Sequence, residues 1–515
     1  MMDPIHKLAV ETIQLNKQAI IFAPSRASAE KSAEEISKLT NFQYPEMEHE
    51  VLKAASSSTK QCRRLSRCLR KGIAFHHAGL LQKQKDLIED EFRGGKIKII
   101  CCTPTLAAGM SLPAYRVIIK SLKRYSGRWG MDWIPVLEYM QMAGRAGRPE
   151  FETEGQAITI AKTEKEKEEI YNTYVTGEPE EIYSKLAVEP VLRTYLLSLI
   201  SSGIIRDEKS MKEFFSKTFW ASQFKDFARL EIIMDKMLSL LDKWGFVTIS
   251  GADKINDDFV TADHLNKDNQ EIRKLKATLV GRRVSELYLD PLTARHLLDC
   301  LINFKENKNS FSLLQMISYC LEMRPQLRVK AKEQDKIQEQ LVKNYDLLLM
   351  DEPSAFDLDY AQFINSVKTT LFFEAWINED NEDYLLETYD IRPGEIRMKI
   401  EIADWLLYSS AELSKVSNFS NELIRELYKL RTRVKAGVKE ELLVLLKLKG
   451  IGRVRARKLI NNGLKDLGDL KKIDLTSLSQ ILGVTLAVDV KKQLGEEVKE
   501  IPKMTRKGQL SLNKF

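Results

Sequence analysis

The sequence predicts an α/β domain with a parallel sheet, followed by a longer and mostly helical region. Over the first 165 residues, short apolar runs alternate with amphipathic helical patterns, as in a doubly wound sheet. The run at 97–102 (IKIICC) is apolar enough for a strand covered on both faces. After about residue 185, helical patterns dominate.

The elements follow from these patterns in chain order. Strands are expected at 18–23, 72–77, 97–102, 117–119 and 157–161, with helices at 28–39 and 80–92. The segment 120–133 has two strand-like arms around a glycine-containing turn, which predicts a β-hairpin. Helices over 190–244 end in a strand at 245–250, an order that suggests a winged helix.

Long helical patterns then indicate a helical bundle, and a glycine-punctuated unit follows it. The expected domains are 1–175 (α/β), 176–265 (winged helix), 266–432 (helical bundle), 433–500 (glycine-punctuated helices) and 501–515 (tail). A length of 515 residues suits three or four folded domains.

Composition places the chain among globular proteins with apolar cores. Hydrophobic residues make up 43% and charged residues 30%. The net charge of +7 is modest and does not by itself indicate nucleic acid. No run is apolar and long enough for a membrane span, and no signal-peptide pattern opens the chain, so we expect a cytoplasmic protein without a membrane partner. The six cysteines form no CxxC pair, so neither a disulfide framework nor a metal site is expected.

The segment Gln141–Pro149 (QMAGRAGRP) has two arginines three positions apart, each after a glycine. The glycines let the backbone approach another surface, and guanidinium groups match phosphate oxygens. Arg145 and Arg148 are therefore candidate arginine fingers, side chains that stabilise a phosphoryl group during its transfer. A surface turn with two solvated arginines is the alternative.

This segment resembles motif VI of superfamily 2 helicases. Ala19–Arg26 (AIIFAPSR) resembles motif IV, and Cys102–Ala114 (CTPTLAAGMSLPA) resembles motif V. Gly72–Leu80 (GIAFHHAGL) resembles the segment between those two motifs. The order is that of the family. Further likeness at 281–291, 400–407 and 450–459 points to the archaeal Hjm helicases, the HelQ-like branch.

The resemblance implies an ATP-dependent 3′–5′ DNA helicase acting on forked or branched DNA in replication-coupled repair. It also implies two RecA-like domains, a winged helix, a helical ratchet domain and a helix-hairpin-helix domain. The chain matches this plan from the second RecA-like domain onward. It has no GxxxxGK[ST] loop, so ATP and Mg²⁺ are expected to be held mainly by a RecA-like domain missing from this sequence. Leu347–Pro353 (LLLMDEP) resembles a Walker B strand, but we interpret it as a helix end and loop.

The resemblance also implies roles for residues of the α/β domain. Thr103 and Thr105 follow a predicted parallel strand, and ligands bind at that end of open α/β sheets. Met110-Ser111 departs from the Val-Asn that the family often has there. The residues expected in catalysis are Gln141, Arg145 and Arg148; near the nucleotide, Gly109 and Gly144; and on DNA, Ser25, Arg26, His77, Thr103 and Thr105.

Two aromatic positions suggest base stacking. Tyr125 and Trp129 lie in the predicted hairpin among basic residues, and a hairpin at this place in the family splits the duplex. Trp405 lies in a helical segment whose counterpart in the family stacks on single-stranded DNA. Arg397 is the nearest arginine to the position, here Met398, where the family commonly has one. The alternatives are an ordinary surface hairpin and a core tryptophan.

The segment 447–458 has six basic residues and no acidic one. Its Gly-Ile-Gly before a helix is typical of a helix-hairpin-helix, whose amides bind a DNA phosphate without reading sequence. A solvated basic helix is the alternative. The candidate DNA-binding residues here are Gly450, Gly452, Arg453, Arg455 and Arg457.

The tail resembles the peptide that docks on the sliding clamp PCNA. Its candidate clamp-binding residues are Gln509, Leu512 and Phe515. The expected partners are thus single-stranded and forked DNA, the missing RecA-like domain in cis or in trans, and PCNA. The main alternative is a non-catalytic DNA- and clamp-binding module that regulates a partner motor, and an RNA helicase is a weaker one.

Overall fold

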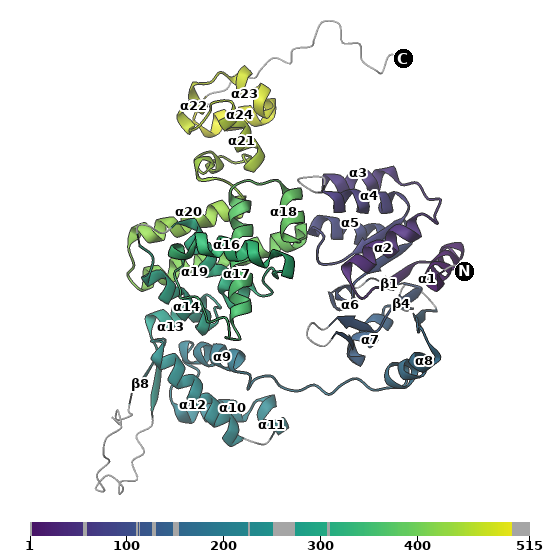
Figure 1. Cartoon of the computed structure of the whole chain (residues 1–515), viewed down its shortest axis with the longest axis horizontal. Helices are drawn as coiled ribbons and strands as arrows, with labels where there is room; N and C mark the ends of the chain where they lie inside the picture. Colours follow the sequence, from purple (N-terminus) through teal and green to yellow (C-terminus); the bar gives the residue numbers. More distant parts are fainter. Residues whose placement is uncertain are drawn as a thin grey trace. The chain divides into compact units, whose positions relative to one another are not determined.

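The computed structural model describes residues 3–54, 59–109, 112, 114–125, 130–147, 154–224, 227–250, 273–305 and 309–496 (Figure 1). The chain divides into two compact units. The first unit comprises Met1–Arg295 and Asn381–Ile402, and the second comprises His296–Asp380 and Ala403–Phe515. The first unit is therefore discontinuous in sequence.

The first unit contains a parallel sheet of five strands in the order β2-β3-β1-β4-β7. The strands are β1 (Ala19–Phe22), β2 (Ile73–His76), β3 (Ile99–Cys102), β4 (Arg116–Ile119) and β7 (Gln156–Thr159). Every residue of the first four is buried, as expected for strands covered on both faces. The five predicted strands of this domain are confirmed.

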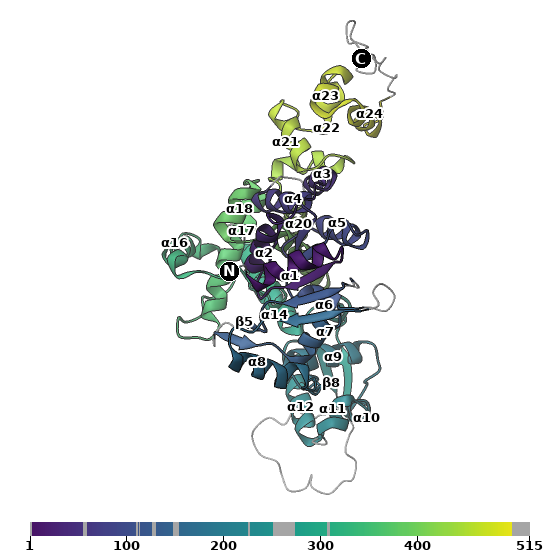
Figure 2. The ribbon, with the colours of Figure 1, turned by 90° about the vertical axis from the view of Figure 1, so that its right-hand side faces the viewer.

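Helices group around this sheet in both views (Figure 2). They are α1 (Pro4–Gln14), α2 (Arg26–Ser37), α3 (Pro45–Lys53), α4 (Lys60–Arg70), α5 (Gln82–Arg93), α6 (Thr105–Gly109) and α7 (Val136–Ala143). The two helices predicted at 28–39 and 80–92 are confirmed as α2 and α5. No element was predicted in the region of α3 and α4, although α4 buries Leu65 and Leu69 at helical spacing.

The predicted hairpin is present as β5 (Lys123–Tyr125) and β6 (Met131–Trp133), which pair antiparallel. After α8 (Glu164–Ile170) and one π-helical turn at Tyr171–Val175, the first unit continues with a helical group. Its helices are α9 (Glu189–Ser201), α10 (Glu208–Ser216), α11 (Phe219–Phe224), α12 (Phe227–Lys243) and α13 (Leu279–Glu286). Its strands β8 (Val247–Ser250) and β9 (Lys274–Ala277) form an antiparallel ribbon, so this group extends past residue 265, the predicted boundary.

The second unit is helical, and two helices connect it with the first unit along the chain. These are α14 (Pro291–Ile302) and α19 (Pro393–Val416), which follows α18 (Glu382–Tyr389). The unit's other helices are α15 (Ser310–Tyr319), α16 (Gln334–Lys343), α17 (Tyr360–Ile377), α20 (Asn421–Ala436), α21 (Arg453–Asn461), α22 (Leu467–Lys472), α23 (Leu475–Leu482) and α24 (Val484–Gln493). Leu347–Pro353 continues from a 3-10 turn (Tyr345–Leu347) into irregular chain, so the Walker B likeness has no strand behind it.

None of the helices in the described ranges has the length and apolar character needed to cross a bilayer.

Candidate nucleic-acid interface

A hollow of about 420 Å³ lies where strands β1 and β3 end. Its walls also include the base of the β5–β6 hairpin and the helix α7. The lining residues are Pro24, Pro104, Thr105, Ser121, Lys123, Arg124, Ile134, Pro135, Leu137, Glu138 and Gln141. Carboxyl ends of parallel strands meet at one edge of a sheet, where open α/β folds bind ligands. The fold thus brings the segments resembling motifs IV, V and VI together.

Two hydroxyl groups lie at this edge. The Thr103 and Thr105 Oγ1 atoms are 2.8 Å apart, and neither side chain is buried. Thr105 is the first residue of α6 and lines the hollow, whereas Thr103 follows β3 directly. The two hydroxyls are hydrogen-bonded to each other, so one is left to donate to a phosphate oxygen, and both can do so once that bond is released.

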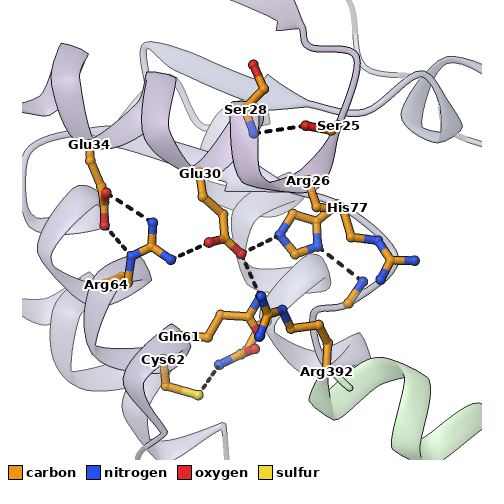
Figure 3. Close-up of polar contacts among 12 residues, drawn as sticks. Ser25, Arg26, Ser28, Glu30, Glu34, Gln61, Cys62, Arg64, His77 and Arg392 are labelled. Atoms are coloured by element: carbon orange, nitrogen blue, oxygen red, sulfur yellow. Dashed lines mark hydrogen bonds and ion pairs between the residues drawn. The ribbon is translucent and has the colours of Figure 1, made fainter. Parts of the chain in front are cut away.

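Ser25 and Arg26, at the end of β1, both have partners within the protein. The Ser25 hydroxyl accepts a hydrogen bond from the Ser28 N–H (3.2 Å) and so caps α2 (Figure 3). The Arg26 guanidinium forms an ion pair with the Glu395 carboxylate. The Arg26 side chain is 41% exposed, so it also remains open to solvent.

His77 has no exposed surface to offer to DNA, because its side chain is 0% exposed. Its Nδ1 accepts from the Gly79 N–H (3.1 Å), so Nε2 carries the proton and donates to Glu30 (3.1 Å; Figure 3). The direct DNA contact expected for His77 is therefore not supported in this structure. A histidine beside a helicase-like motif looks the same in sequence whether it is buried or exposed.

Glu30 is the centre of this buried network. It also accepts from Gln61 (3.0 Å) and pairs with Arg64, which in turn contacts Glu34 (Figure 3). Burial by itself would raise the pKa of Glu30, but the hydrogen bonds from His77 and Gln61 and the charge of Arg64 lower it to about 2. The network fixes the loop that follows β2.

The arginine motif begins at the end of α7. Gly144 caps this helix through a hydrogen bond from its N–H to the Met140 carbonyl (2.8 Å). The Arg145 guanidinium donates to the Ala107 carbonyl in α6, and the Ala114 N–H donates to the Arg145 carbonyl (3.0 Å). The segments resembling motifs V and VI are thus held together.

The other residues expected near a nucleotide have separate positions. Gln141 is exposed and lines the hollow. Gly109 is the last residue of α6. Arg148 lies outside the described residues.

Trp133 is the aromatic residue of the β5–β6 hairpin whose side chain the structure describes, and it packs against neighbouring side chains. Trp133 contacts the Tyr174 ring (5.8 Å between centroids), and the Lys123 ammonium lies 4.0 Å from the Trp133 ring centroid. Arg124 pairs with Glu138 (2.8 Å). Tyr125 ends β5, but its side chain is not among those described, and Trp129 lies outside the described residues. Trp133 thus belongs to the base of the hairpin.

Helix α19 contains both candidate residues of the expected ratchet. Trp405 is half-buried, and Arg397 is exposed and pairs with Glu401 (3.0 Å). At about 3.6 residues per turn, Met398 lies on nearly the same face as Trp405, whereas Arg397 is rotated away by roughly 80°. Tyr408, which was not predicted, lies one turn after Trp405 with the Arg431 guanidinium 4.8 Å from its ring.

The three candidate arginines of the glycine-punctuated unit have different partners. Gly450 has a φ of +85°, and Gly452 is the N-cap of α21. Arg455 is exposed and donates to the Gly450 carbonyl (2.7 Å). Its lysine neighbours Lys447, Lys449 and Lys458 are exposed as well.

The other two arginines are engaged inside the second unit. Arg453 lies 5.1 Å from the Trp376 ring and donates to the Asp380 carbonyl (2.8 Å). Arg457 makes two hydrogen bonds to Glu379 (2.7 and 2.9 Å). Arg453 and Arg457 therefore hold α21 to the end of α17, which the run of basic residues did not reveal.

Within the described residues, no group of three or more His, Cys, Asp or Glu side chains is arranged to hold a metal ion. The candidate clamp-binding residues Gln509, Leu512 and Phe515 lie outside the described part of the chain.

Two family models match the sequence. The model of the helicase conserved C-terminal domain matches residues 3–150, which contain the parallel sheet except for β7. The model of archaeal helicase domain 4 matches residues 311–437, which span most of α15 to α20.

The chain is also similar over nearly its whole length to archaeal proteins named ATP-dependent DNA helicase Hel308. It is 35% identical over 512 residues to the one from Pyrococcus abyssi, covering 98% of this chain and 67% of that protein. The values for Methanocella arvoryzae are 34% over 517 residues, 98% and 66%, and those for Caldivirga maquilingensis are 31% over 503 residues, 94% and 64%. The chain thus spans about two thirds of the length of these relatives. It belongs to the Hel308 (Hjm-type) family of archaeal superfamily 2 DNA helicases.

Proposed function

We propose that this chain is the DNA-engaging part of an ATP-dependent helicase that moves 3′ to 5′ on forked or branched DNA during replication-coupled repair. The observation that carries the proposal is the hollow at the sheet edge, where Thr105 and Gln141 lie beside basic side chains. Family membership supports a DNA helicase, and the polarity and substrate follow from the resemblance to Hjm helicases.

DNA binding in this proposal begins at the carboxyl edge of the sheet. The Thr103 and Thr105 hydroxyls hold a backbone phosphate, while Lys123 supplies positive charge beside it and Arg124 does so when the phosphate replaces Glu138 as its partner. Trp405 stacks on a base, and Arg455 with its lysine neighbours binds phosphates.

The nucleotide site requires a second RecA-like domain, in cis or in trans. The chain offers the arginines of the QMAGRAGRP segment, whose forks suit a γ-phosphate. Its sequence has no GxxxxGK[ST] loop, and its described residues show no Asp-Glu pair at a strand end for Mg²⁺. ATP with Mg²⁺ supplies the free energy for movement when bound, and this chain's part is to stabilise the phosphoryl charge.

The architecture supports the remaining domain assignments as proposals. We propose that α9–α13 with the β8–β9 ribbon form a winged helix, and that α21–α24 form a helix-hairpin-helix domain. The PCNA-binding role of Gln509, Leu512 and Phe515 remains a proposal from the sequence.

The test is ATP hydrolysis and single-stranded DNA binding by this chain, alone and with a RecA-like domain that carries a P-loop. We expect no turnover by the chain alone, restored DNA-stimulated turnover in the two-part motor, and salt-sensitive DNA binding in both. Each phosphate neutralised should contribute about −0.7 to the slope of log affinity against log salt.

Other outcomes would overturn parts of the proposal. Turnover by the chain alone would place a complete nucleotide site within it. DNA binding without turnover by the two-part motor would favour a non-catalytic regulatory module instead. Loss of DNA binding altogether would contradict both.

Replacing Trp405 with alanine should weaken single-stranded DNA binding by roughly 5- to 150-fold, because stacking of a base on an aromatic ring is worth about 1–3 kcal/mol. Fluorescence anisotropy with a labelled oligonucleotide measures the change. Trp405→Phe, which keeps an aromatic face, should retain most of the affinity. A folded Trp405→Ala variant with unchanged affinity would make this tryptophan a packing residue.

A further inference from the structure

The segment Asn381–Ile402 packs with the parallel-sheet unit, although the rest of that unit ends at Arg295. It meets the loop that follows β2, where the Gly394 N–H donates to the Gly79 carbonyl (3.1 Å). The first turn of α19 is therefore joined to the loop after β2 by a direct hydrogen bond between the two backbones.

Glycine is required at position 394 by this close approach. A Cβ atom there would lie 2.4 Å from the Ala78 carbonyl oxygen and 2.6 Å from that of Leu80. Both partners are backbone atoms and cannot turn aside as a flexible side chain can. The position of α19 along the loop is therefore set sterically.

The loop itself is held from behind by the Glu30 network described above. His77 receives the Gly79 N–H on one ring nitrogen and donates to Glu30 with the other. The loop on which α19 rests is thus held by hydrogen bonds within the parallel-sheet unit.

Beside this fixed contact lies an exchangeable one, between Glu395 and Arg26. One oxygen of Glu395 pairs with Arg26, and the other accepts from the Arg392 N–H (2.9 Å) at the start of α19. The side chains of Arg26 and Glu395 are 41% and 28% exposed. Arg26 is also one of the residues that the resemblance to motif IV places on DNA.

We propose that Glu395 and a DNA phosphate compete for Arg26. Partly exposed ion pairs contribute little to stability, so a phosphate of the bound strand can displace the carboxylate. On displacement, Glu395 keeps its bond to the Arg392 N–H, and the Gly79–Gly394 hydrogen bond keeps α19 in place. DNA binding at Arg26 thereby removes one ion pair to the first turn of α19, the helix that carries Trp405. This inference rests on the proposed function.

The experiment is a salt titration of single-stranded DNA binding by the full chain with Glu395→Gln. Glutamine can still accept from the Arg392 N–H but offers no charge to Arg26. We expect about 2- to 5-fold tighter binding at low salt, the equivalent of a surface ion pair. The salt slope should become steeper by up to about 0.7, because Arg26 in the unaltered chain divides its time between Glu395 and that phosphate.

A matched control separates this effect from the loss of one negative charge. Glu387→Gln removes the same charge from the same segment and frees Lys60, which has no role proposed on DNA. It should change affinity and slope less than Glu395→Gln does. In an Arg26→Ala background, Glu395→Gln should have no effect, because its target is gone.

Two results would overturn the inference while the chain still binds DNA. One is an equal change in affinity and slope for Glu395→Gln and Glu387→Gln. The other is a Glu395→Gln effect that persists in the Arg26→Ala background. Absence of DNA binding by the unaltered chain would instead contradict the proposed function.

Discussion

Replacing Arg145 with alanine is expected to lower ATP turnover by the two-part motor by about 10³-fold, the lower end of the contribution of an arginine finger. The Arg145 guanidinium already lies against the segment resembling motif V, where it donates to the Ala107 carbonyl. A charged fork in that position can turn to a γ-phosphate presented by a neighbouring RecA-like domain. Steady-state hydrolysis at saturating single-stranded DNA measures the loss.

Two further variants make the Arg145 result specific. Arg145→Lys keeps the charge but not the planar fork, so it should recover only part of the rate. Arg93→Ala removes an exposed arginine that pairs with Asp90 on α5 and should leave turnover unchanged. If Arg145→Ala kept turnover within about tenfold of the unaltered protein, this arginine would not be acting as a finger.

The second large effect is on stability, at Glu30. Glu30→Gln should destabilise the parallel-sheet unit by about 3 kcal/mol, the low end for breaking a buried ion pair, because Arg64 keeps Glu34 as a partner. His77, fully buried, would lose its charged acceptor. Hydrogen exchange of the β2 and α2 amides reports the change in this unit specifically.

The effect should depend on pH in a defined direction. The pKa of Glu30 is lowered from 4.5 to about 2, so its contribution to stability is fully present above pH 4.5 and is lost as pH falls toward 2. The difference between Glu30→Gln and the unaltered chain should therefore shrink in that window. Glu34→Gln, which removes the more exposed partner of Arg64, should cost less, about 1 kcal/mol or below. Equal costs for the two variants would contradict a special role of the buried carboxylate.

The sheet could be predicted because its strands carry their own signal. Runs such as Ile99–Cys102 are apolar throughout, and in an α/β pattern such a run is typical of a parallel strand that is covered on both faces. Helix α4 has no such signal, because its many arginines mask the apolar face formed by Leu65 and Leu69. Short-range patterns therefore indicated the layers but not every helix that covers them.

The sequence predicted which segments form the site, but it did not predict which side chains are paired with one another. The hollow combines segments already grouped by their resemblance to motifs IV, V and VI. By contrast, Arg26 meets an acid 369 positions later, and Arg457 meets Glu379 78 positions earlier. A local sequence pattern cannot distinguish an arginine that binds phosphate from one that binds a distant carboxylate, since the residue type is the same in both cases.

The hydrogen bond between Gly79 and Gly394 has a consequence for how the protein folds while it is being synthesised. Domains usually fold as they leave the ribosome, at about 5–20 residues per second. The last strand of the sheet ends at Thr159, but its unit is completed only by Asn381–Ile402. A nascent chain therefore waits roughly 10–50 s between finishing the sheet and receiving the segment that covers the loop after β2. During that interval the loop after β2 is not covered by Asn381–Ile402. A chain released before residue 402 would lack part of the segment that completes this unit.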